Sequence, residues 1–168
     1  MSIGIDNFRD EYLNNDKTLK EEYILLYSSS PAFPAIPHNI TLLIYNDLSF
    51  EIKLVWYKFP FEGRIYSIYK SNFIPENVIE TLNELNKIEH LKLQELYSTY
   101  TGKYVPDDSS HDSYYFNHRG ETFSVNMSSY LKGESLFVSD HEKIVLKFYK
   151  QLKNWKEHLY EKITNIHE

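Results

Sequence analysis

The chain has 168 residues, a formal net charge of −6 and no cysteine. This length fits one globular domain over residues 1–168, because 42% hydrophobic residues can build a sizeable core. The lack of cysteine excludes disulfides, thiolate catalysis and cysteine-based metal sites, and it fits a reducing compartment. No secretion signal opens the sequence and no apolar run approaches the ~20 residues of a membrane span, so we expect a soluble, cytoplasmic protein with no membrane contact.

The first part of the chain predicts one short helix and then several strands. Residues 7–20 place a few apolar side chains on one side of a short helix. Residues 22–28 form an apolar run that ends at serines and prolines, which is typical of a strand before an irregular loop. Residues 40–45 and 49–57 flank a turn, and the second run alternates apolar and polar side chains. Residues 64–70 add a further β-favouring run, so an antiparallel meander is predicted.

Two helices are predicted in the rest of the sequence. Pro75 and Glu76 suit the first turn of a helix, and apolar residues recur at helical spacing toward a stop at Gly102. Ser139 and Glu142 have the spacing of a capping box, in which each residue satisfies a backbone N–H of the other. Apolar residues then recur every three or four positions, which predicts a terminal helix of roughly 25 residues with one continuous apolar face.

The remaining β signal is a hairpin. Residues 114–118 and 121–127 flank Arg119 and Gly120, and the second run alternates apolar and polar positions. The apolar face of the terminal helix must be buried, and a sheet of the same chain is the commonest partner. The sequence therefore predicts an α+β fold, an antiparallel sheet of about five or six strands packed against a central helix and a long C-terminal amphipathic helix.

Negative charge is concentrated in the middle of the chain. Residues 71–112 contain eight acidic residues and three basic ones. Such a surface repels nucleic acid and attracts a basic protein, although the same charges also serve solubility alone. The candidate partner-binding residues are the acidic and aromatic side chains of this region: Glu76, Glu80, Glu84, Tyr97, Tyr100, Tyr104, Asp107, Asp108 and Asp112.

These features favour a binding function. We expect a protein-binding module of the immunity or inhibitor type, which neutralises a basic partner such as a toxin domain and needs no cofactor. The simpler interpretation of the same residues is a solvated helix face and tyrosines that belong to the core.

An enzymatic alternative depends on one polar cluster. The glycines are too scattered for a phosphate-binding loop, and the segment that begins at His141 lacks the second histidine of a zinc-protease motif. His111, Asp112, His118 and Glu121 could instead serve a small metal-dependent or acid–base hydrolase. This alternative requires the two histidines to meet each other or a carboxylate, and the sequence assigns no metal ligand with specificity.

Overall fold

A computed structural model describes residues 9–30, 38–58, 63–89, 91, 111–128 and 139–165. It has the α+β fold that the sequence predicts, with six strands and a long C-terminal helix. The elements in chain order are α1 (Arg9–Tyr12), β1 (Tyr23–Ser30), β2 (His38–Tyr45), β3 (Phe50–Lys58), β4 (Gly63–Ser71), α2 (Glu76–Lys87), β5 (His111–His118), β6 (Glu121–Ser128) and α4 (Asp140–Asn165).

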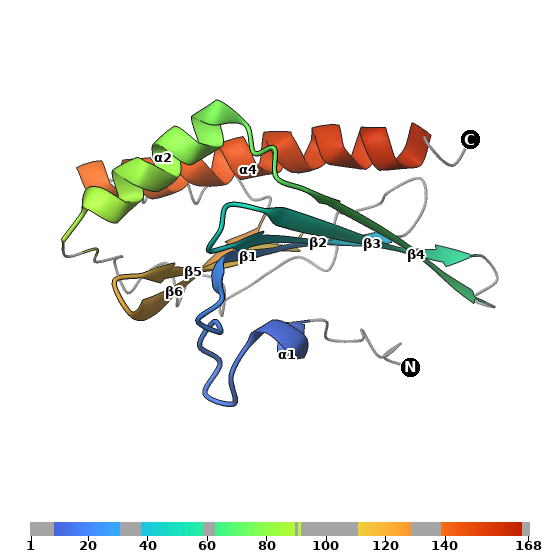
Figure 1. Cartoon of the computed structure of the whole chain (residues 1–168), viewed down its shortest axis with the longest axis horizontal. Coiled ribbons are helices and arrows are strands. Elements are labelled where there is room, and N and C mark those ends of the chain that lie inside the picture. The colour runs from blue at the N-terminus through green and yellow to red at the C-terminus, as the bar shows by residue number, and fades with distance from the viewer. Residues whose placement is uncertain are drawn as a thin grey trace.

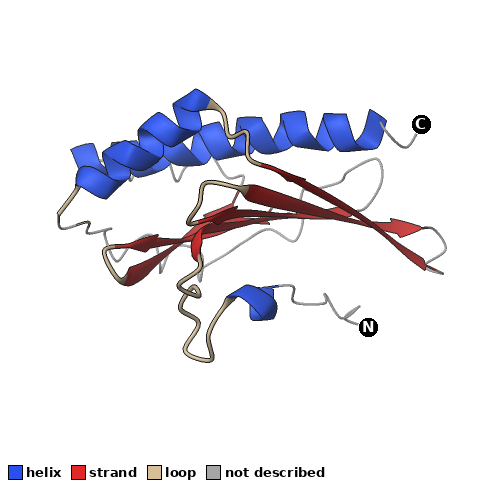
Figure 2. Ribbon diagram, in the orientation of Figure 1, coloured by secondary structure: helices blue, strands red, loops and turns tan. Residues whose placement is uncertain are grey.

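The six strands form one antiparallel sheet in the order β4-β3-β2-β1-β5-β6. The predicted meander and the predicted hairpin are both confirmed, and the chain passes from the β4 edge through α2 before β5 pairs with β1. Helices α2 and α4 lie on one face of the sheet, whereas α1 lies on the opposite face (Figures 1 and 2). The sheet is therefore covered mainly from one side by helices.

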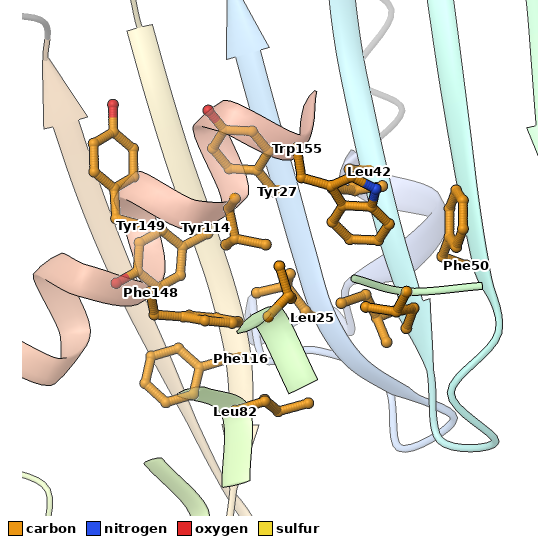
Figure 3. Packing of buried hydrophobic residues seen from close by; sticks show 14 of the residues in the cluster. Leu25, Tyr27, Leu42, Phe50, Leu82, Tyr114, Phe116, Phe148, Tyr149 and Trp155 are labelled. Carbon is orange, nitrogen blue, oxygen red and sulfur yellow. The ribbon is translucent and has the colours of Figure 1, made fainter. Parts of the chain in front are cut away.

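The main core fills the space between the sheet and these two helices. Phe148 and Trp155 of α4 and Leu82 of α2 project onto aromatic and aliphatic side chains of the strands (Figure 3). The rings of Trp155 and Phe50 meet edge to face, with their centroids 4.8 Å apart. The apolar face of the terminal helix thus packs on the protein's own sheet, as its periodicity predicts.

A smaller apolar cluster lies on the other face of the sheet. It consists of Tyr12, Leu19, Leu26 and Leu43, because the segment after α1 folds back onto the strands. Within the described residues 9–20, the predicted short helix comprises the four residues of α1. Because this segment covers part of the second face, β3 is not simply half-buried. Glu51 is only 5% exposed there, and the nitrogen of Lys70 lies 3.0 Å from its carboxylate.

The central helix is shorter than the apolar spacing predicts. Helix α2 ends at Lys87, because Ile88 has an extended backbone with φ −73° and ψ 118°. The predicted continuation toward Gly102 falls largely on residues 92–102, which lie outside the described part of the chain. The strand predicted over residues 114–118 starts earlier than expected, since β5 already begins at His111.

Candidate functional site

Two of the three predicted glutamates lie on the outer side of α2. Val78, Leu82 and Leu85 of this helix are buried, so Glu76 and Glu80 point away from the core, and both are exposed. Neither carboxylate forms an ion pair with any residue that the structure describes. The negative charges of Glu76 and Glu80 therefore face solvent.

Glu84 differs from the other two glutamates because it faces α4. Its carboxylate lies 3.3 Å from the nitrogen of Lys147. Both side chains are about half exposed, so this ion pair contributes little to stability, but it offsets the charge of Glu84. Of the three predicted glutamates on α2, only Glu76 and Glu80 thus form no ion pair with the residues that the structure describes.

Large apolar side chains are exposed close to the start of α2. Phe73 is 77% exposed and lies three residues before Glu76. Leu48 is also exposed, and the pairing of Phe50 with Ser71 brings the β2–β3 turn and the end of β4 to the same end of the sheet. The exposure of Phe73 could not be predicted from the sequence, because a single apolar residue in a connection has no periodicity that would mark it as exposed or buried.

Asp112, another predicted contact residue, does not belong to this surface. Asp112 lies in β5, where strand alternation turns it toward α4, and it is 2% exposed. Asp112 is therefore not the exposed contact residue that the sequence predicts, and its carboxylate accepts a hydrogen bond of 2.7 Å from the Tyr149 hydroxyl. The remaining members of the predicted surface lie outside the described residues: Tyr97, Tyr100, Tyr104, Asp107 and Asp108.

Asp112 belongs to a buried polar cluster between the sheet and α4. Ser29 of β1 pairs with Asp112 in the register of the two strands, and Lys156 of α4 donates to the Ser29 hydroxyl over 3.3 Å. The hydroxyl groups of Tyr27 and Tyr149 point the same way along the strands (Figure 3). The Tyr27 hydroxyl and the second oxygen of Asp112 are buried without a hydrogen bond of good geometry to described residues, although the Tyr27 hydroxyl interacts with the side chains of Ser29 and Asp112.

Burial dominates the electrostatics of this cluster. It raises the pKa of Tyr149 and of Tyr27 well above the usual tyrosine value, and the negative charge of Asp112 raises both further. Burial also lowers the pKa of Lys156, while Asp112 acts in the opposite direction. The hydrogen bonds of Tyr149 with Asp112 and of Lys156 with Ser29 join α4 to the sheet, and all four residues are buried there.

The cluster required for the enzymatic alternative does not assemble. His111 and His118 stand at opposite ends of β5, about 23 Å apart at ~3.3 Å per residue. His118 is buried, and its Nε2 lies 3.1 Å from the backbone oxygen of Leu85, at the end of α2. Arg119 donates to the backbone oxygen of Asn86, so both residues satisfy carbonyls of the last turn of that helix.

The described residues contain no group of three His, Asp or Glu side chains that could hold a metal ion. None of the helices in the described ranges combines the length and the apolar character that crossing a membrane requires. No family model and no curated protein matches the chain. Its function is therefore inferred from the contacts described above.

Proposed function

We propose that the chain is a protein-binding module that binds a basic partner on the outer side of α2. Two observations carry this proposal: the carboxylates of Glu76 and Glu80 are exposed and form no ion pair with described residues, and the exposed ring of Phe73 lies three residues before Glu76 in the chain. Unpaired surface charge speeds the encounter with a partner of opposite charge. A buried aromatic anchor then supplies much of the affinity in many interfaces.

The charges on α4 restrict where such a partner can bind. Lys143, Lys147 and Lys150 are exposed on the neighbouring helix, and Lys147 lies beside Glu84. A basic surface would be repelled by this row of lysines, so the contact is confined to the side of α2 that carries Glu76 and Glu80. The surface is narrower than the charge of residues 71–112 alone suggests.

The type of partner is the finer part of the proposal. An acidic, cysteine-free protein that blocks a basic toxin domain in the cytoplasm, as an immunity protein does, fits this surface. His118 and Asp112, which the enzymatic alternative needs, are instead used to hold α2 and α4. This use of both residues favours binding over hydrolysis.

Capture from a lysate of the native host, followed by titration with the purified partner, tests the proposal. The wild-type chain should retain a basic protein whose binding weakens as salt rises, because exposed charges are screened within ~8 Å at physiological ionic strength. The variant Glu76→Lys/Glu80→Lys should bind at least about tenfold more weakly, since two attractions become repulsions.

The matched control is Glu21→Lys/Glu22→Lys, which reverses two exposed charges in the turn before β1. This variant should retain wild-type affinity, and all three proteins should show the same thermal unfolding. Equal binding by both double variants, or a captured partner that is acidic, would refute the proposed function.

A further inference from the structure

The segment before β1 covers part of the second face of the sheet as a strap, which we define as residues 9–20. It comprises α1 and the loop that follows, on the side of the sheet opposite α2 and α4 (Figure 2). Tyr12 and Leu19 of the strap are buried in one cluster with Leu26 of β1 and Leu43 of β2. Among the described residues this cluster shares no member with the main core, because the sheet lies between them. Loss of the strap contacts would therefore leave the main core in place.

The strap holds its own shape through hydrogen bonds within itself. The backbone N–H of Asn14 donates to the carbonyl of Thr18 over 2.8 Å, and the N–H of Lys20 donates to the carbonyl of Tyr12 over 3.0 Å. Lys17 has a left-handed backbone with φ 65°, and its N–H donates to the carbonyl of Asn14 over 2.9 Å, which closes the turn. These backbone groups find their partners without the sheet, so the strap can leave the sheet as one unit.

Side chains of the sheet hold the strap in place. The backbone N–H of Leu19 donates to the Thr122 hydroxyl of β6 over 3.0 Å. The nitrogen of Lys53 on β3 lies 5.0 Å from the centre of the Tyr12 ring and 3.4 Å from the carboxylate of Glu11. The side chain of Glu11 is 60% exposed, so this ion pair is weak. Contacts of this kind open at a lower free energy than a buried core does.

We propose that the strap opens from the sheet as one unit while the rest of the fold stays intact. Opening uncovers Leu26 and Leu43, which are only 0% and 1% exposed when the strap is closed. The strap thus controls access to an apolar face that is exposed only in a minor state of the protein. This face lies on the other side of the sheet from α2, so the device is independent of the basic partner proposed above.

The chain contains no cysteine, so an introduced thiol can report the opening of the strap. The variant Leu43→Cys places a thiol under the strap, and the matched variant Leu42→Cys places one under the helices at the adjacent position of β2. A small disulfide reagent should label the first thiol at least about tenfold faster than the second, because local opening costs less free energy than global unfolding. Low urea concentrations should accelerate mainly the labelling of Leu42→Cys, since opening of the strap exposes little surface.

Hydrogen exchange of the wild-type chain is the second measurement, because either substitution could itself loosen the packing. The backbone N–H of Leu19 should exchange at least about tenfold faster than the N–H groups that pair β1 with β2, and its rate should be nearly independent of urea below the unfolding transition. The proposal is overturned if the thiol of Leu43→Cys is labelled as slowly and with the same urea dependence as that of Leu42→Cys. It is also overturned if the N–H of Leu19 exchanges only together with those of the strands.

Discussion

Two buried tyrosines of the polar cluster are similar in position but differ in their hydrogen bonds. The Tyr149 hydroxyl donates to Asp112 over 2.7 Å, whereas the Tyr27 hydroxyl interacts with Ser29 and Asp112 without a hydrogen bond of good geometry. Removing one partner of a buried hydrogen bond leaves the other group unsatisfied, and this costs more free energy than the hydrogen bond itself contributes. The two hydroxyls should therefore contribute differently to stability.

We predict that Tyr149→Phe lowers the free energy of unfolding by about 1–3 kcal/mol, because it leaves the Asp112 carboxylate buried without its donor. Tyr27→Phe should cost clearly less, since the Tyr27 hydroxyl interacts with Ser29 and Asp112 without a hydrogen bond of good geometry. Urea unfolding of both variants against wild type measures the difference. Equal losses would mean that the Tyr27 hydroxyl is hydrogen-bonded.

Alkaline pH should destabilise the protein through its buried tyrosines. Burial raises the pKa of Tyr27, Tyr114 and Tyr149 above the value of about 10 that tyrosine has in an unfolded chain. Above pH ~10 the unfolded state then holds fewer protons than the folded state, so stability falls as pH rises. Below pH ~10 these three tyrosines remain protonated in both states, so they do not make the free energy of unfolding depend on pH.

Absorbance at a phenolate wavelength, followed together with circular dichroism, tests this prediction. The exposed tyrosines should ionise first, and the last tyrosines should ionise only as the fold is lost. Complete ionisation of all tyrosines below the alkaline unfolding transition would contradict the burial of these hydroxyls.

At the scale of one element, the start of α4 is held by a reciprocal cap. The backbone N–H of Glu142 donates to the Ser139 hydroxyl, and the backbone N–H of Ser139 donates to the Glu142 carboxylate, each over 3.2 Å. We predict that Ser139→Ala lowers stability by about 0.5–2 kcal/mol. Glu142→Gln retains an acceptor and should cost less. Thermal unfolding of the two variants measures both losses of stability. A larger loss of stability for Glu142→Gln than for Ser139→Ala would contradict this account of the cap.

The segment after α1 is also held by a few named contacts. The side-chain amide of Asn117 donates to the backbone oxygens of Lys20 and Tyr23 over 3.1 and 3.0 Å. The side-chain oxygen of Asn117 accepts a hydrogen bond from the Thr122 hydroxyl. That hydroxyl in turn accepts one from the backbone N–H of Leu19. Asn117→Ala should therefore speed hydrogen exchange at Leu19 far more than in the strands. Unchanged protection at Leu19 would show that apolar packing alone holds the segment.

At the scale of the whole molecule, periodicity and local chemistry made most of the fold predictable. Alternation located β3 and β6, and the spacing of Ser139 and Glu142 gave the start of α4 within a residue. These signals are local, because each depends on side chains within one or two turns or strand repeats.

The features that could not be predicted arise from contacts between distant segments. Asp112 is buried because β5 pairs with β1 beneath α4, and Glu51 is buried because a segment before β1 folds over β3. The pairing of Glu84 with Lys147 likewise depends on how α2 lies along α4. Glu84 and Asp112 are therefore lost from the predicted acidic surface through tertiary packing, which no local pattern encodes.

The most direct test of the central claim is a hydrogen-exchange footprint of the complex with the captured basic partner. The amides of α2 around Glu76 and Glu80 should gain protection, and the Glu76→Lys/Glu80→Lys variant should lose that gain at the same partner concentration. Protection confined to the opposite face of the sheet, around α1 and β3, with no change in α2, would contradict the proposed binding surface.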